Sequence, residues 1–297
     1  MQTLSEIRAI LEEAGLKPTK RFGQNFLFDK NLMAQIVQLA EVTGEQVVLE
    51  VGPGTGSLTE ELLARAARVV AVEIDRGLGD VLERRLGDND RFTLIRGDVL
   101  ESKHAIAPQV HAALAPRATM VANLPYNVAT PLVAQCLIDS WRAQAPGGPG
   151  GLCRFERLTF TVQREVAERF AARVGSDAYG PISIYAALLG HVRLGPVLPA
   201  SAFWPRPDVA SQVVRIDFDG KAAAAIPNID TLLAVVTLSF AQRRKQIGSI
   251  IRRRESPFVP QNLADAMAAA GIDPQQRAEQ VTPDSFAAMA RSLGAVS

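Results

Sequence analysis

The chain has 297 residues, of which 47% are hydrophobic and 21% are charged. This length and composition are typical of about two globular domains and exclude wholesale disorder, collagen and fibrous coiled coil. The formal net charge is +1, so any sign of a nucleic-acid partner must come from where the charges lie rather than from their sum. Two cysteines cannot form a disulfide framework, and no cysteine–histidine cluster suggests zinc. We therefore expect no metal site and a reducing compartment.

The first forty residues contain two predicted helices and no targeting segment. Apolar residues at helical spacing predict helices over 4–14 and 30–41. Charged residues, among them Glu6 and Arg8, interrupt the stretch that would have to be apolar in a signal peptide. No apolar run approaches the ~18 residues of a membrane span. We therefore expect a cytoplasmic protein without a membrane partner.

From residue 47 onward the sequence has the pattern of buried strands. Short apolar runs alternate with helical stretches, and they lie at 47–51, 69–72, 92–95 and 120–122. This alternation is typical of a parallel sheet with helices on both faces. Three later runs predict further strands, some of them antiparallel, at 158–162, 182–189 and 209–218. The pattern predicts an α/β fold with a doubly wound sheet.

Two segments mark joints in the chain. The Pro/Gly-rich stretch 145–151 predicts a surface connector. After Asp219 the pattern is helical only, and the predicted helices cover about 228–253, 261–270 and 283–293. We therefore predict two domains, residues 1–219 and a small all-helical domain of residues 220–297.

Four successive predicted strands end in residues that could bind a ligand. In chain order these are the glycines of 52–56, then Glu73, Asp98 and Asn123. In an open α/β sheet ligands bind outside the carboxyl ends of the strands, so these residues should converge. Glycines allow close approach of the backbone, a carboxylate after the second strand suits the two hydroxyls of a ribose, and Asp98 suits an adenine amino group. A purely structural glycine turn stays open. The spacing of GPGTG differs from GxGxxG, which disfavours a nicotinamide dehydrogenase.

The segment Asn123-Leu124-Pro125-Tyr126 directly follows the fourth strand. Pro125 stiffens the loop and removes an N–H, which leaves the Asn123 side-chain oxygen and nearby carbonyls as acceptors. With the flat face of Tyr126, the loop fits a planar substrate that bears an exocyclic amine. Such an amine is a poor nucleophile because its lone pair is delocalised, and two acceptors on its N–H bonds would turn the nitrogen toward a tetrahedral geometry. An ordinary Asn-Pro turn is the alternative.

A second aromatic segment, residues 203–209, precedes the last predicted strand. Its prolines stiffen it, so that Phe203 or Trp204 is placed to cover a flipped base opposite Tyr126. An aromatic plug at an edge of the core is an equally good interpretation of the same residues.

Basic side chains gather within the predicted helix 228–253. They are Arg243, Arg244, Lys245, Arg252 and Arg253, followed by Arg254. Residues seven or eleven apart share one face of a helix, which predicts a local basic surface of the kind that neutralises phosphates. A solvated helix face is the alternative.

Taken in order, these motifs resemble the family of small-subunit ribosomal RNA adenine N6,N6-dimethyltransferases. The matching segments are 20–27, 50–56, 72–75, 97–98, 123–127, 203–207 and 243–245. The resemblance implies a Rossmann-like methyltransferase fold with S-adenosylmethionine as the cofactor. It also implies dimethylation of two adjacent adenosines near the 3′ end of small-subunit rRNA, by a monomer that acts on an immature small ribosomal subunit and so contributes to ribosome biogenesis.

The resemblance also implies a role for each candidate residue. The expected cofactor-binding residues are Asn25, Leu27, Gly52, Glu73, Asp98 and Asn123. The expected catalytic residues are Asn123, which holds the target amine, and Tyr126 and Phe203, which stack on the base. The expected RNA-binding residues are Arg243, Arg244, Lys245 and Arg252. Two departures from the family pattern bear on RNA binding: Asp208 stands where Lys is common, and 145–151 resembles an insertion.

Two other functions stay open on the sequence. One is that of the related large-subunit rRNA methyltransferases that confer macrolide resistance. The full run 123–127 and the basic C-terminal region favour the small subunit, by resemblance only. The other is a ribosome-assembly or transcription-associated binding factor whose catalysis is dispensable.

Overall fold

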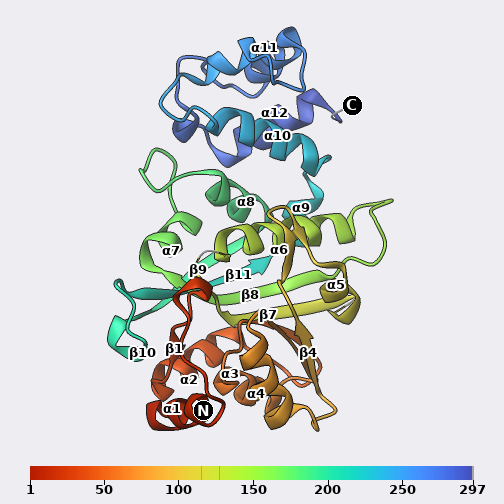
Figure 1. Cartoon of the computed structure of the whole chain (residues 1–297). Helices are drawn as coiled ribbons and strands as arrows, with labels where there is room; N and C mark the ends of the chain where they lie inside the picture. The colour runs from red at the N-terminus through yellow and green to blue at the C-terminus, as the bar shows by residue number, and fades with distance from the viewer. Residues whose placement is uncertain (115, 127, 296–297) are drawn as a thin grey trace. The chain divides into compact units, whose positions relative to one another are not determined.

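The computed structural model describes residues 1–114, 116–126 and 128–295. Its centre is a seven-stranded sheet with the strand order β4-β3-β2-β7-β8-β11-β9 (Figure 1). The strands are β2 (Val47–Val51), β3 (Arg68–Glu73), β4 (Phe92–Arg96), β7 (Arg117–Asn123), β8 (Arg154–Gln163), β9 (Gly190–Leu198) and β11 (Ser211–Phe218). The pairs from β4 through to β8 are parallel, whereas β8 and β11 are antiparallel. The predicted α/β fold with a mostly parallel sheet is confirmed.

The central strands are buried along their whole length. In β2 and β3 every residue after the first is buried, and so are the five middle residues of β7. Because successive side chains of a strand point to opposite faces, unbroken burial shows that both faces of the sheet are covered. From β2 the sheet is extended first on one side, by β3 and β4, and later in the chain on the other side, by β7 and β8. This is the switch point at which an open α/β sheet leaves a crevice for a ligand.

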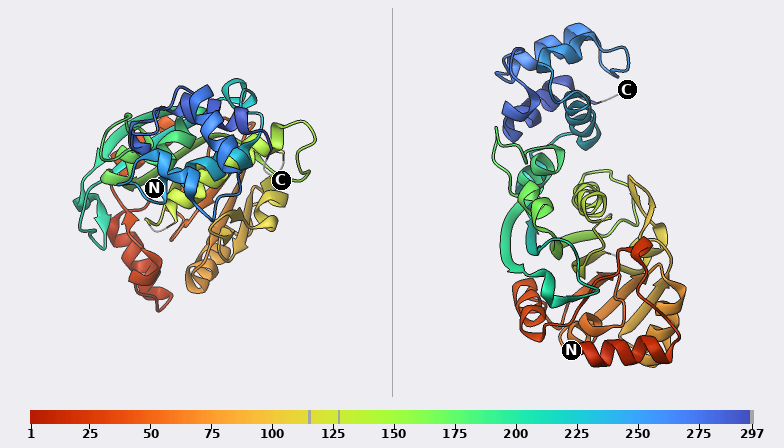
Figure 2. Two further views of the ribbon diagram at one scale, coloured as in Figure 1. Left: turned by 90° about the horizontal axis from the view of Figure 1, so that it is seen from above. Right: turned by 60° about the vertical axis from the view of Figure 1, so that its left-hand side comes forward.

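Helices pack against this sheet, as drawn in Figures 1 and 2. They are α2 (Lys30–Ala40), α3 (Ser57–Leu63), α4 (Arg76–Leu86), α5 (Pro108–Leu114) and α6 (Ala129–Gln144). Two of them begin at an aspartate that accepts backbone N–H groups, Asp29 for α2 and Asp75 for α4. A carboxylate there satisfies N–H groups that the first turn leaves unbonded. The exposed stretch 146–151 follows α6, on the surface as predicted.

The N-terminal arm begins with α1 (Leu4–Glu13), which starts at a capping box formed by Thr3 and Glu6. The chain then runs through a 3₁₀ turn at Lys20–Phe22 to the short strand β1 (Phe26–Leu27). β1 pairs in antiparallel fashion with β10 (Phe203–Trp204). The arm and the aromatic segment 203–209 are therefore joined by backbone pairing, which the sequence did not indicate.

Two arginines, one buried and one partly buried, connect the C-terminal end of α2 to the sheet. Arg215 on β11 donates to the carbonyl oxygen of Leu39 at 2.8 Å, and Arg157 on β8 donates to that of Ala40 at 2.9 Å. Both guanidinium groups also pair with Asp217, at 2.8 and 2.7 Å. Cations at a helix C-terminus satisfy free carbonyls and complement the helix dipole. The network thus fixes a helix whose inner face packs in the core.

Smaller elements complete this part of the chain. They are β5 (Leu100–Ser102), β6 (Ala105–Ile106), α7 (Arg164–Phe170) and a 3₁₀ turn at Ala200–Ala202. Both cysteines, Cys136 and Cys153, are buried and free. Among the described residues no cluster of three metal-ligating side chains occurs. Across residues 1–114, 116–126 and 128–295, no helix is both long and apolar enough to cross a membrane.

The chain packs into two units. The first is Met1–Ala167 with Val192–Phe218, and the second is Glu168–His191 with Asp219–Ser297. The second unit contains α8 (Pro181–Leu189), α9 (Gly220–Ala224), α10 (Ile229–Phe240), α11 (Pro260–Ala269) and α12 (Pro283–Leu293) (Figure 1). It thus consists mainly of helices, and it includes the segment 168–191 that lies outside the predicted domain 220–297. The functional roles assigned to the two domains stay predictions.

Two predicted elements in the second unit are wrong. The apolar run 182–189 is the helix α8 rather than a strand, with Pro181 in its first turn. Its residues are buried almost all round, because α10 and α12 pack against it. A short continuous apolar run cannot by itself separate a buried strand from a buried helix.

The predicted helix 228–253 is also wrong, because it is interrupted. α10 ends at Phe240, and only a 3₁₀ stretch at Ile247–Arg252 follows the intervening turns. Backbone N–H groups of Ile247 and Gly248 donate to the carbonyls of Gln276 and Pro274, at 2.7 and 2.9 Å, instead of continuing the helix. A Cβ atom at Gly248 would lie 2.7 Å from the Cβ of Pro274. The backbone of the 3₁₀ stretch is thus bonded to a second segment, in a way that a continuous helix would not allow.

Candidate active site

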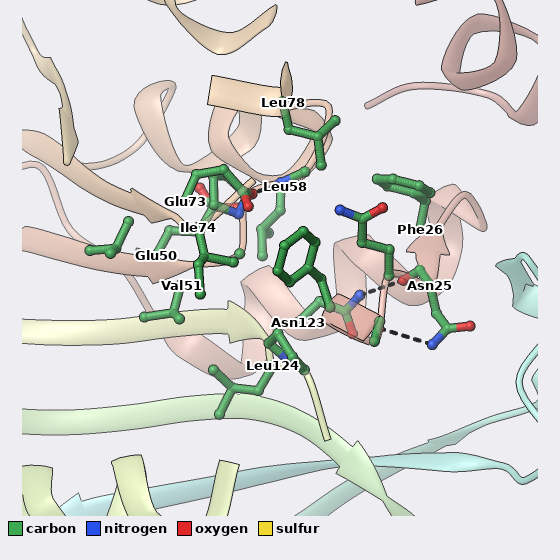
Figure 3. Close-up of a pocket in the computed structure, with 18 of the residues that line it drawn as sticks. Asn25, Phe26, Glu50, Val51, Leu58, Glu73, Ile74, Leu78, Asn123 and Leu124 are labelled. Carbon is green, nitrogen blue, oxygen red and sulfur yellow. Dashed lines mark hydrogen bonds between the residues drawn. The ribbon is translucent and has the colours of Figure 1, made fainter. Parts of the chain in front are cut away.

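A cavity lies at the carboxyl ends of β2, β3 and β7 (Figure 3). One wall consists of strand-end residues, and the opposite wall is the N-terminal arm, residues 21–27. All six residues predicted to bind the cofactor line it: Asn25, Leu27, Gly52, Glu73, Asp98 and Asn123. Tyr126 lines it as well. Strand ends and arm therefore meet around one space, while the individual roles of these residues stay predictions.

The glycine turn after β2 depends on glycine for its backbone conformation and for the close approach of the N-terminal arm. Gly52, Gly54 and Gly56 have φ values of +68°, +62° and +88°, a left-handed region that other residues avoid. A Cβ atom at Gly54 would lie 2.9 Å from the Cε1 of Phe26 on the arm. The turn thus brings bare backbone to the cavity, and its shape depends on glycine.

Glu73 is held rigidly beside this turn. Its carboxylate accepts the N–H of Gly54 at 3.2 Å and that of Asp75 at 2.8 Å. The side chain is buried, and burial raises its pKa to about 7, although both backbone hydrogen bonds lower it. An acceptor with a fixed position at the end of β3 fits the predicted contact with a ribose diol.

A second buried carboxyl in the cavity wall, Glu50, was not among the predicted site residues. It lies on β2, it is 2% exposed, and its Oε2 atom has no hydrogen-bond partner among the described residues. Burial, reinforced by the neighbouring Glu73, raises its pKa to about 8. The signal was present in the sequence, since an acid inside the apolar run 47–51 is costly to bury without a purpose. The sequence analysis therefore missed a buried acidic residue in the cavity wall.

We expect the binding of S-adenosylmethionine to strengthen as the pH rises from 6 to 8. Below pH 7 Glu73 is largely protonated and a poorer acceptor for two hydroxyls, so the dissociation constant should fall about tenfold over this range.

Over the same range the free protein should lose stability. The reason is that its folded state keeps protons on Glu50 and Glu73, which the unfolded chain releases near the ordinary value of 4.5. Isothermal titration calorimetry measures both the affinity and the proton release.

The control for this prediction is Glu73→Gln, which cannot ionise at that position. It should bind more weakly at pH 8 and show a flatter pH dependence than the natural chain. Equal affinity of the natural protein at pH 6 and pH 8 would contradict the assignment of Glu73.

Asp98 lies at a more open part of the cavity. It follows β4, its side chain is exposed, and one carboxylate oxygen accepts the N–H of Leu100 at 3.0 Å. The other oxygen is left for a donor such as the adenine amino group that the sequence suggested.

Asn123 is the last residue of β7, and its side chain faces the arm. Its Nδ2 atom donates to the backbone carbonyl of Asn25 at 3.0 Å, a bond drawn in Figure 3. The Asn25 side chain donates in turn to the carbonyl of Gly23 at 3.1 Å. The candidate catalytic amide and the arm over the cofactor cavity are thus directly connected. Asn127, the last residue of the matching segment 123–127, lies outside the described residues.

The structure places Tyr126 at the cavity and leaves Phe203 away from it. The Tyr126 hydroxyl is hydrogen-bonded to that of Ser211 at 2.8 Å, and burial raises its pKa. Phe203 is 3% exposed, belongs to the core cluster that contains Leu27 and Leu198, and does not line the cavity. In this structure Phe203 is therefore the core plug that the sequence left as an alternative, and its predicted stacking on a base would require it to leave the core.

The basic residues of the second unit form no common helical face, because helix α10 ends before them. Arg243 is tied to Glu279 at 2.8 Å and to the carbonyl of Asp177 at 2.6 Å. Arg244 and Lys245 are exposed in the turns that follow α10, and Arg252 is exposed in the 3₁₀ stretch. The predicted face with a repeat of seven and eleven is thus wrong, although the basic side chains remain at the surface.

Residues 15–294 match the profile of the family described as ribosomal RNA adenine dimethylase. The chain belongs to this family. Its activity is the S-adenosylmethionine-dependent methylation of adenines in ribosomal RNA. The resemblance seen in the sequence is thereby confirmed, and a nicotinamide dehydrogenase is excluded.

Relatives and solved structures agree with this membership. The chain is 38% identical to the ribosomal RNA small subunit methyltransferase A of Acidothermus cellulolyticus, over 97% of this chain and 93% of that protein. It is 37% identical to the protein of the same description from Magnetococcus marinus, over 98% of both chains. Among solved structures, a dimethyladenosine transferase from Plasmodium falciparum has a TM-score of 0.66 at 23% identity, with 89% of this chain and 95% of that one covered. The 23S rRNA methyltransferase ErmE has a TM-score of 0.61 at 24% identity, with 91% and 99% covered. These two likenesses support the fold.

The cavity fits the cofactor of this family. Gly52 and Gly54 present backbone without side chains to the cavity, Glu73 offers a fixed acceptor, and Glu50 adds a buried carboxyl to the wall. We expect these residues to hold S-adenosylmethionine together with Asp98 and the arm. When bound, that cofactor supplies a methyl group activated by a positively charged sulfur.

Proposed function

We propose that this protein dimethylates N6 of two adjacent adenosines near the 3′ end of small-subunit rRNA. The observation that carries the proposal is the connected site itself, in which Asn123 and Tyr126 line the same cavity as Glu73 and the glycine turn. The relatives described as small subunit methyltransferases support the choice of subunit. The fold does not decide it, because ErmE, a 23S rRNA methyltransferase, also matches.

The target adenine would be held by the loop 123–126. Its amino group offers two N–H donors, and the Asn123 oxygen and a loop carbonyl offer acceptors. Gripping both N–H bonds turns the nitrogen lone pair out of conjugation with the ring, so no general base has to remove a proton beforehand. Tyr126, fixed by Ser211, supplies a flat face for the ring. The arm forms one wall of the cavity and would shield from water the space in which the charge of the cofactor is lost.

The substrate is proposed to be an immature small ribosomal subunit, met by a monomer in the cytoplasm, in a step of small-subunit biogenesis. Methyl transfer from labelled cofactor to small subunits isolated from cells that lack this protein tests this directly. Label should appear on N6 of two neighbouring adenosines near the 3′ end, as mapped by mass spectrometry. Label on large-subunit rRNA would favour the other branch of the family, and binding without any label would favour an assembly factor.

The RNA contact is expected to depend on the exposed residues that follow α10. Arg244→Ala/Lys245→Ala should weaken binding to small subunits roughly tenfold or more and lower the slope of log K against log salt by about two, since two phosphate contacts are lost. The matched control is Lys103→Ala/Lys221→Ala, which removes two exposed charges from other elements. Filter binding at several salt concentrations measures the slope. The same loss in both variants would show that only total charge matters.

A further inference from the structure

The amide of Asn123 is held from two sides. Its Nδ2 atom donates to the carbonyl oxygen of Asn25 (Figure 3), and its Oδ1 atom accepts a hydrogen bond from the hydroxyl of Thr161 on β8. Nothing in the sequence pattern singled out Thr161, because it lies inside an ordinary strand run. The second contact is therefore a product of the fold.

Strand pairing places Thr161 beside Asn123. The two residues are direct partners in the parallel pair β7–β8, and Thr161 is also paired with Val213 of β11 on its other side. Paired residues of neighbouring strands put their side chains on the same face of the sheet. Thr161 is completely buried, and its β-branched side chain has few rotamers. Its hydroxyl thus has a fixed position next to the amide.

The two contacts together select one orientation of the amide. The Asn25 carbonyl can only accept, so the NH₂ group must face it, and the oxygen then faces the Thr161 hydroxyl, which donates. A flip by 180° would set the amide oxygen against the Asn25 carbonyl and leave two acceptors facing each other. In the selected orientation the Oδ1 atom keeps one free lone pair. That lone pair can accept a hydrogen bond from an N–H of an amino group.

We propose that Thr161 is a positioning residue, whose hydroxyl holds Asn123 in the orientation that accepts an N–H of the target amine. The inference rests on the proposed role of the loop 123–126 in holding that amine. It adds that β8, which contributes no residue to the lining of the cavity, sets the geometry of the reaction through this one hydroxyl.

The test is Thr161→Val, which keeps the shape and removes the donor. We expect kcat for methyl transfer to small subunits to fall roughly tenfold, the size of effect that one hydrogen bond supports. KM for the particle, the dissociation constant for S-adenosylmethionine and the melting temperature should stay unchanged, and Thr161→Ser should restore kcat.

Thr159→Val is the matched control. Thr159 lies two residues away on the same face of β8 and is equally buried, but its hydroxyl has no partner among the described residues. The chemical change is the same and the contact with Asn123 is absent, so kcat should not change. An undiminished kcat in Thr161→Val, an equal loss in Thr159→Val, or a failure of Thr161→Ser to restore activity would each overturn the proposal.

A second readout does not depend on activity. The side-chain NH₂ signals of Asn123, identified by their absence in Asn123→Ala, should include one proton protected from solvent exchange by the Asn25 carbonyl. Thr161→Val should remove that protection, whereas Thr159→Val should not. If the natural protein transferred no methyl group to rRNA, the proposed function would fail, yet these signals would still decide the orientation. Unaltered signals in Thr161→Val would overturn the role of Thr161 even in an active enzyme.

Discussion

Replacing Asn123 by alanine should lower methyl transfer by on the order of 10³-fold, to below detection in ordinary assays. The variant loses the side-chain acceptor for the target amine, and it also loses the bond to the Asn25 carbonyl that joins the loop to the arm. Both losses disturb the position of the target amine in the transition state, so their effects on the rate of methyl transfer add. Transfer of labelled methyl groups to small subunits under single-turnover conditions measures the loss.

The binding measurements show whether this loss is catalytic. Asn123→Ala should bind small subunits with nearly the natural affinity, because Asn123 contributes no charge to the phosphate contacts. Asn31→Ala is the control, since Asn31 is an exposed asparagine on α2 away from the cavity lining, and it should retain full activity. If activity and particle binding fell in parallel in Asn123→Ala, the residue would be a binding or structural residue and its assigned role would be wrong.

The second large effect is expected on stability. Arg215→Met should lower the free energy of unfolding by about 3 kcal/mol, which corresponds to a fall of roughly 8 °C in melting temperature. The guanidinium is almost completely buried, and its removal leaves the Leu39 carbonyl without its donor and deprives Asp217 and Glu41 of a cation. Because α2 supplies Met33 and Ile36 to the cavity, cofactor affinity should fall as well. Thermal unfolding followed by circular dichroism measures the first effect.

Arg193→Met is the matched comparison for this prediction. Arg193 pairs with the same Asp217 at 3.3 Å, but its side chain is 60% exposed. Water screens an exposed ion pair, so its removal should cost no more than about 1 kcal/mol. Equal losses in the two variants would show that burial of Arg215 adds nothing, and that the helix–sheet connection is held by apolar packing alone.

Much of the cofactor site could be read from the chain because its geometry follows from local rules. The apolar runs before Gly52, Glu73 and Asn123 are strands in the structure, and the residues that end them line one cavity. In a parallel sheet all carboxyl ends lie at one edge, so the order of strands along the chain already brings these residues together. The family resemblance then supplied the identity of the cofactor.

The two wrong elements and the burial of Phe203 have a common origin in contacts between distant segments. The run 182–189 is a helix because other helices surround it. The helix predicted to reach residue 253 ends at Phe240, and the backbone at Ile247 and Gly248 is bonded to Gln276 and Pro274 instead of to a preceding helical turn. Phe203 is buried because β10 pairs with the N-terminal arm, a partner almost 180 residues earlier in the chain. Periodicity describes how one segment buries its own face, and it carries no information on which other segment covers it.

The sequence by itself thus determined the strand ends, the glycine turn and the loop 123–126, since each depends on neighbouring residues and on the fixed direction of parallel strands. Only the tertiary structure decided that Glu50 is buried in the cavity wall, that Thr161 and Asn25 both bind the Asn123 amide, and that Arg243 pairs with Glu279. These contacts join residues dozens of positions apart. Their existence depends on strand register and on the close packing of side chains, which no local pattern encodes.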